Sequence, residues 1–276
     1  MTANILRNVR YAFRTLGRTP GSPVLAVLTL ALGIGANGAV FSAIDTVLLR
    51  PMPFPNADRL VLLRQVRDDS VVSGVAPIRV EDWNSLSSTF ESIAGFYMSD
   101  NTITTGEFPE KIRTANVGPR FFDVLGIMPA LGRAFAAEEH RFGGPAAVLL
   151  GDGYWRARGA DPAVLDNPIP AGSSTINIVG VLPPELRYPE PSIDTWTPIT
   201  NAPWTTPRTL TWYTVIGRLQ SGVTLDQAEA DLENVQAQLA AQFPETDSNL
   251  TIHAEPLKDI VVGGSRASLW LLFGAV

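Results

Sequence analysis

The longest apolar run of the chain covers residues 24–44 and contains no charged side chain. With a rise of about 1.5 Å per residue, a helix of this length crosses a hydrocarbon core of roughly 30 Å. The run therefore predicts a transmembrane helix, which we place at residues 21–49. A cleaved signal peptide is the alternative, but its apolar region is usually only about 7–15 residues long. The length of the run favours an uncleaved anchor.

Residues 1–20 have the pattern of a basic amphipathic helix. At about 100° per residue the apolar side chains share one arc, and the opposite arc holds Arg7, Arg10, Arg14 and Arg18. Such a helix lies in the headgroup plane with its arginines near lipid phosphates. The first acidic residue is Asp45, so the arginines are uncompensated and predict a cytoplasmic N-terminus. The chain after about residue 50 is then expected outside the cytoplasm.

Three glycines inside the apolar run, Gly33, Gly35 and Gly38, have the G-x-G-x-x-G spacing of a dinucleotide-binding loop. That fingerprint requires a preceding strand, which an apolar helix does not provide. In a membrane helix, small residues instead let neighbouring helices approach closely, and the amide of Asn37 requires a partner on another helix. These four residues therefore predict helix packing in an assembly of several helices.

The last residues, 266–276, form a second apolar stretch with no charge after Arg266. We interpret this stretch as the start of a second transmembrane helix that is cut off at Val276. So few residues cannot span a bilayer by themselves, and the last turn of a core helix is the alternative.

Residues 50–265 alternate between strand and helix patterns. Apolar alternation predicts strands at 59–66, 93–105, 110–117, 146–150, 175–181, 212–219 and 250–255. Helices are predicted at 80–90, 119–125, 152–158 with Asp152 as its cap, and 224–242 with Thr224 as its cap. The buried stripe of the last helix is expected to consist of Leu225, Ala228, Leu232, Val235 and Leu239. This order predicts an α+β domain that could form two lobes.

The charge of this region argues against one class of partner. The chain has 21 basic and 27 acidic side chains, and the four arginines of residues 1–20 are among the basic ones. The remaining region is therefore strongly acidic. This balance excludes a nucleic-acid partner, whose phosphates require clustered lysines and arginines.

The chain lacks the residue types on which most catalytic and metal sites depend. It has no cysteine, which removes thiol catalysis, disulfides and most structural zinc sites. Its only histidines are His140 and His253, and the neighbours Glu138, Glu139 and His140 rarely converge on one ion. It has neither a G-x-S-x-G elbow nor a G-x-x-x-x-G-K-[ST] loop. We therefore expect no catalytic residue, no cofactor, no metal and no enzymatic activity.

Five ordered blocks carry a family resemblance. They cover residues 30–37, 47–55, 121–133, 179–183 and 216–224. In these blocks the chain resembles the N-terminal part of a MacB-like, FtsX-like ABC transporter permease with a MacB-like periplasmic core domain. The resemblance implies that residues 50–265 form this domain outside a bacterial inner membrane, and that further membrane helices follow Val276.

The residues that we take as the family motif are Phe121, Phe122, Leu125, Gly126, Pro129, Gly132, Arg133, Gly180, Pro183, Gly217, Arg218, Leu219 and Gly222. We expect its glycines to serve turns and not to bind ligands. Its two arginines are expected to anchor salt bridges or loop carbonyls, and neither is expected to be catalytic. At 166–170 the family usually has a glycine turn leading into a strand. Two prolines here remove backbone donors and put that hairpin in doubt.

The resemblance implies a permease subunit whose outer domain moves with its membrane helices. Its partners would be the lipid bilayer, a separate cytoplasmic ATPase, a second permease copy in a dimer, and a periplasmic protein or exported substrate. The alternative is a membrane-tethered periplasmic binding or scaffold module without an ATPase. Because phosphate-binding loops are absent, we expect this chain itself to bind no ATP.

Overall fold

The computed structural model describes residues 21–44, 52–67, 70–71, 74–103, 109–171, 174–200 and 206–263. The chain divides into two compact units, one of Met1–Arg50 with Val261–Val276 and one of Pro51–Ile260. The basic helix predicted at 1–20, with Arg7, Arg10, Arg14 and Arg18, lies outside the described residues, as does the apolar stretch 266–276.

The first unit contains helix α2 (Gly21–Ile44), which exposes several large apolar side chains, including Leu32 and Ile34. Among the described residues, no helix is long and apolar enough to cross a membrane. The structure therefore does not show the transmembrane helix that the sequence predicts at 21–49.

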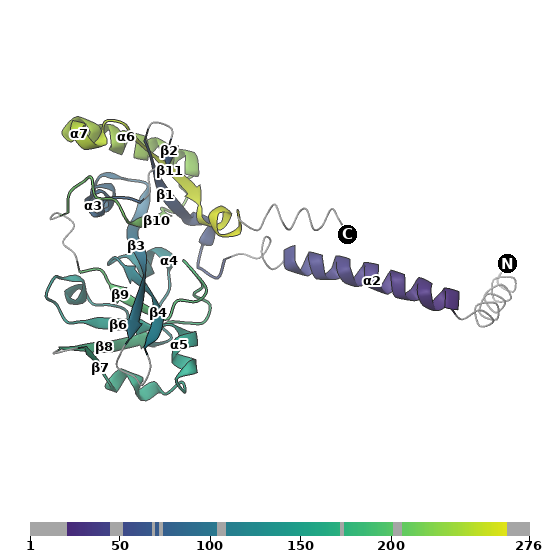
Figure 1. Ribbon diagram of the computed structural model, residues 1–276. Helices are drawn as coiled ribbons and strands as arrows, with labels where there is room; N and C mark the ends of the chain where they lie inside the picture. Colours follow the sequence, from purple (N-terminus) through teal and green to yellow (C-terminus); the bar gives the residue numbers. More distant parts are fainter. Residues whose placement is uncertain are drawn as a thin grey trace. The chain divides into compact units, whose positions relative to one another are not determined.

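Within Pro51–Ile260 the described strands form one eleven-stranded sheet (Figure 1). The strands are β1 (Leu60–Arg67), β2 (Ser70–Val71), β3 (Phe90–Ile103), β4 (Glu110–Val117), β5 (Leu131–Gly132), β6 (Ala147–Leu150), β7 (Ile169–Ala171), β8 (Ser174–Val181), β9 (Thr195–Pro198), β10 (Thr214–Leu219) and β11 (Leu250–Pro256). The α-helices are α3 (Pro77–Leu86), α4 (Phe121–Leu125), α5 (Asp152–Ala157), α6 (Leu225–Gln242) and α7 (Pro244–Asp247). Three short 3-10 helices are η2 (Ala57–Arg59), η3 (Ala137–His140) and η4 (Pro162–Asp166).

One half of the sheet consists of two interleaved β-α-β units. Helix α3 leads from β1 to β3, and α6 leads from β10 to β11. The strands lie in the order β11-β1-β10-β3, and every neighbouring pair is antiparallel. This is the ferredoxin-like split β-α-β arrangement. A buried cluster joins the sheet to both helices through Val61, Trp83, Ile93, Val215 and Leu232.

The other half of the sheet is inserted between β3 and β10. Strand β3 belongs to both halves, because it pairs with β10 up to Phe96 and with β4 from Phe96 onward. The sheet then continues through β9, β6, β8 and β5, and it is parallel at β4–β9 and at β6–β8. The predicted α+β fold is confirmed. Both halves of the sheet belong to one compact unit, and a division into two lobes stays a prediction.

Several predicted helix limits require correction. Helix α3 begins at Pro77 and ends at Leu86, and not at 80–90, because proline is favoured in the first turn of a helix. Helix α5 begins after Gly151, and no side chain caps it, so Asp152 is not the cap. Thr224 does cap α6, where its Oγ1 accepts a hydrogen bond from the backbone N–H of Gln227 at 3.3 Å. The predicted stripe of α6 is buried, except that Leu225 is half-buried.

The hairpin of β7 and β8 forms despite its prolines, so the doubt raised by the sequence was wrong. Residues 169–171 pair with residues 174–176 in antiparallel register. Because β7 pairs with β8 alone among the described strands, Pro170 lies on an edge, where proline is tolerated.

Candidate functional site

The chain enters and leaves the unit Pro51–Ile260 at neighbouring places. We call residues 52–58 the incoming segment and residues 257–260 the outgoing segment. Phe54 and Leu257 belong to one buried cluster, and Met52 and Ile260 pack against it. A surface cavity of about 360 Å³ is lined by residues of both segments, with Lys258 from the outgoing one. Both connections of the unit therefore lie at one place.

Arg218 of β10 fixes the incoming segment. Its side chain is buried, with 6% exposed. Its Nε donates to the backbone oxygen of Val124 at 2.8 Å, and its Nη1 donates to those of Pro55 at 3.0 Å and Asn56 at 3.4 Å. Burial lowers the pKa of the guanidinium, which still remains charged. One planar cation thus ties together β10, the end of α4 and the incoming segment, which we call the Arg218 clamp.

A second arginine supports the clamp from η2. The Nε of Arg59 donates to the backbone oxygen of Leu219 at 2.7 Å. Its guanidinium also forms an ion pair with Glu91 of β3. The start of β1 is therefore held to the end of β10 and the start of β3.

The aromatic motif residues lie in α4, the helix whose Val124 oxygen the Arg218 clamp binds. Phe121 and Phe122 of α4 are buried and meet edge-on, with ring centres 5.5 Å apart. Leu125 is also buried in this cluster. Gly126 ends α4 with a φ of +67°, and a Cβ at this position would lie 3.3 Å from Nη2 of Arg218. Its predicted role in a turn is confirmed, and the position also accommodates the clamp.

A second group of motif residues meets where β5 pairs with β8. Gly132 has a φ of +76° and lies opposite Gly180. A Cβ on Gly180 would lie 2.6 Å from the backbone oxygen of Leu131. Arg133 donates to the buried carboxylate of Glu139 at 2.7 Å. Burial raises the pKa of Glu139, but hydrogen bonds from this arginine and the backbone outweigh burial and lower the pKa.

These positions correct one prediction and confirm another. Gly180 and Gly217 lie inside strands, so they do not serve turns. A Cβ on Gly217 would lie 2.7 Å from the ring of Phe90, and both glycines instead allow close packing. Gly222 has a φ of +84° in the turn before α6, as expected. As predicted, Arg133 forms a salt bridge and Arg218 binds backbone carbonyls. Of the remaining motif residues, Leu219 is buried, and the prolines at 129 and 183 are half-buried.

The glycines predicted to pack membrane helices have no neighbours in the described part of the chain. No described atom outside the helix lies within 4 Å of a Cβ built on Gly33, Gly35 or Gly38. Asn37 donates from its Nδ2 to the backbone oxygen of Gly33 at 3.0 Å, within its own helix. Helix packing at these four residues stays a prediction.

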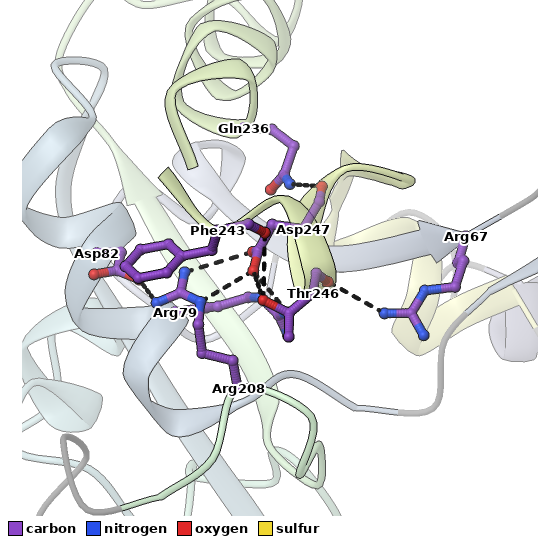
Figure 2. A network of polar contacts seen from close by, with 8 residues as sticks. All are labelled: Arg67, Arg79, Asp82, Arg208, Gln236, Phe243, Thr246 and Asp247. Carbon is purple, nitrogen blue, oxygen red and sulfur yellow. Dashed lines mark hydrogen bonds and ion pairs between the residues drawn. The ribbon is translucent and has the colours of Figure 1, made fainter. Parts of the chain in front are cut away.

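A buried ion network joins α3, α7 and the segment before β10 (Figure 2). Asp247 is fully buried and accepts hydrogen bonds from Arg79 at 2.8 Å, Arg208 at 3.0 Å and Thr246 at 2.6 Å. Arg208 also pairs with Asp82 at 2.8 Å. Burial raises the pKa of Asp247, but these hydrogen bonds outweigh burial and lower the pKa to about 2. Sequence reasoning missed the network, because its members are far apart in the chain.

A largely apolar cleft of about 710 Å³ opens between α3, β3 and η3. At its edge Arg120 and Glu81 form an ion pair at 3.2 Å. His140 lies inside, with its Nδ1 3.3 Å from the backbone oxygen of Ile199. Burial lowers the pKa of His140, so the ring is neutral at neutral pH. In the described part of the chain, no three His, Asp or Glu side chains converge in a way that could hold a metal ion.

Residues 24–235 match the family model of the MacB-like periplasmic core domain. The chain belongs to this family. The chain is also similar in fold to a domain of a protein described as a permease from Porphyromonas gingivalis, which is 18% identical, with a TM-score of 0.54 over 75% of this chain and 93% of that domain.

The periplasmic region of MacB from Actinobacillus actinomycetemcomitans is 14% identical, with a TM-score of 0.52 over 80% of this chain and 98% of that region. At these identities the likeness concerns the fold alone. A comparison with curated proteins found no match. The family resemblance of the sequence blocks is thus confirmed.

Proposed function

We propose that this chain is part of a permease-type subunit of an ABC transporter, with Pro51–Ile260 in the periplasm of a bacterial cell. A separate cytoplasmic ATPase moves the membrane helices, and the periplasmic unit moves with them to act on an exported substrate or a periplasmic partner. A second copy of the permease completes the assembly. Membership of the MacB-like family supports this proposal.

The position of the two connections supports the coupling most strongly. The incoming and outgoing segments pack into one buried cluster, and the Arg218 clamp fixes the incoming one. A displacement of either connection therefore acts on the same place in the unit. Because packed elements transmit strain and do not deform freely, such a displacement moves the unit as a body.

The proposed anchor covers residues 21–49, with the N-terminus in the cytoplasm. The uncharged run at 24–44 and the four arginines before it support this topology. Helix α2 would also expose its large apolar side chains to water without a bilayer. A reporter fused after Arg64 should be active only outside the cytoplasm, and one fused near Thr2 only inside. The opposite pattern would refute the topology.

The chain itself is proposed to catalyse no reaction and to bind no nucleotide. ATP hydrolysis then belongs to a second polypeptide, which tagged full-length protein should retain when it is purified from membranes. Removing the ATPase's phosphate-binding lysine should abolish hydrolysis in that preparation. Nucleotide binding by the chain alone at micromolar concentration would contradict the proposal, and recovery of no ATPase would favour a simple membrane tether.

A further inference from the structure

We propose that the cleft between α3, β3 and η3 binds a small amphipathic molecule with an apolar body and one anionic group. The cleft belongs entirely to the unit Pro51–Ile260, so the inference does not depend on the proposed coupling to an ATPase.

The size and lining of the cleft set the body of the ligand. Its volume of about 710 Å³ lies within the range of roughly 300–1,000 Å³ that is usual for small-molecule sites. Val80, Ile93 and Ile199 line it with aliphatic side chains from three separate segments. Phe142, also part of the lining, is 88% exposed. The three aliphatic side chains are already largely buried, so an apolar body in the cleft would contact them and would remove mainly the Phe142 ring from water.

The charges of the cleft indicate that the polar group of the ligand is an anion. Glu81 and Arg120 neutralise each other, and His140 is uncharged because of its burial. Arg141 also lines the cleft and forms no ion pair with any of the described residues. The lining therefore carries one uncompensated positive charge, which a carboxylate or a similar anion would complement through charge-assisted hydrogen bonds.

One neighbouring charge weakens the attraction between Arg141 and an anionic ligand. Glu138 stands three residues before Arg141, on the surface outside the cleft lining. Its field weakens the attraction for an anion without forming an ion pair with the arginine. We therefore expect the anionic group to improve binding by about tenfold or less, since surface charges interact weakly in water.

The test uses two photoreactive probes that share one apolar body. The anionic probe is para-benzoylbenzoate, and its uncharged match is para-methylbenzophenone. Full-length protein is irradiated with increasing concentrations of each probe, and the labelled peptides are located by mass spectrometry. The wild-type protein should show saturable labelling of the peptides that line the cleft, at a lower concentration for the anionic probe.

Three variants separate the contributions of charge and volume. Arg141→Gln should raise the half-saturating concentration of the anionic probe about fivefold and leave that of the uncharged probe unchanged. Ala137→Trp fills the cleft from an exposed position and should abolish labelling by both probes. Arg187→Gln is the matched control, because this exposed arginine lies outside the cleft and forms no ion pair with any described residue.

Both substitutions in the cleft are at exposed positions, and an unchanged urea midpoint will show that each variant folds. The proposal is overturned if labelling does not saturate, if Ala137→Trp is labelled like the wild type, or if Arg141→Gln and Arg187→Gln have the same effect.

Discussion

Replacing Arg218 by methionine removes the clamp while keeping an apolar side chain of similar length. The change deletes three hydrogen bonds, to the backbone oxygens of Val124, Pro55 and Asn56. The oxygen of Val124 would be left buried without this donor, which costs about 1–3 kcal/mol, whereas Pro55 and Asn56 are exposed to water and the oxygen of Asn56 keeps a hydrogen bond from the backbone N–H of Arg59. The loss is partly offset, because methionine removes a buried cation whose Nη2 has no hydrogen-bond partner. We therefore expect the free energy of unfolding to fall by about 2 kcal/mol.

The assay is urea unfolding of a fragment covering residues 51–263, followed by tryptophan fluorescence. The midpoint should decrease while the slope with urea stays the same, since a loss of stability alone changes only the midpoint. Arg218→Lys keeps one charge but not the planar fork, so it should give an intermediate loss. Arg187→Met is the exposed control and should change stability by less than about 0.5 kcal/mol. If Arg218→Met also lowered stability by less than about 0.5 kcal/mol, the proposed role of the Arg218 clamp would be refuted.

Three further predictions concern the packing and charge of the same unit. Leu232→Asp puts a charge into the core that α6 covers and should lower the free energy of unfolding by about 3 kcal/mol or more. Glu233→Gln, at an exposed position of the same helix, should lower it by less than about 0.5 kcal/mol. Equal losses would mean that the buried face of α6 is misassigned. Because the folded pKa of Asp247, about 2, lies below its ordinary 3.8, its contribution of about 2 kcal/mol is present above about pH 4 and is lost as the pH falls toward 2. Unfolding measured against pH should show this loss, and Asp247→Asn should remove its share of the pH dependence, while Glu139 keeps its own. Gly180→Ala should cost about 1–3 kcal/mol, while Gly153→Ala, with nothing within 4 Å, should cost nothing; similar midpoints in urea would disprove the close approach at Gly180.

Local patterns predicted the elements whose signals lie within a few residues. Strand β4 was placed at its observed limits, and α6 was found from its cap Thr224 and its apolar stripe. The short strands β2 and β7 were missed, and so were β5 and β9. The last two are the more informative. They have two and four residues, and their partners lie far away in the sequence. A short strand is stabilised by pairing and burial, which a local pattern does not contain.

The contacts of the candidate site also depend on residues that are distant in the sequence, so local patterns could not predict them. The sequence predicted that Arg218 would anchor carbonyls, but it could not predict that these belong to Pro55 and Val124. Arg79 and Asp247 are 168 positions apart, and neither stands in a motif. The cleft is lined by segments from α3 to β10, so it exists only once the sheet has formed. Gly180 and Gly217 were predicted to serve turns, because a glycine in a sequence indicates a flexible backbone. The sequence does not show that a neighbouring chain segment lies too close for a side chain at these positions.

We propose that ATP hydrolysis by a separate polypeptide moves the unit Pro51–Ile260 through its two connections. Hydrogen exchange of the full-length protein, assembled with its ATPase and compared with and without ATP, measures whether both connections respond to the ATPase. ATP should change the protection of residues 52–58 and 257–260 together, and an inactive ATPase should not produce this change. Unchanged protection of both segments in a complex that is hydrolysing ATP would refute this coupling.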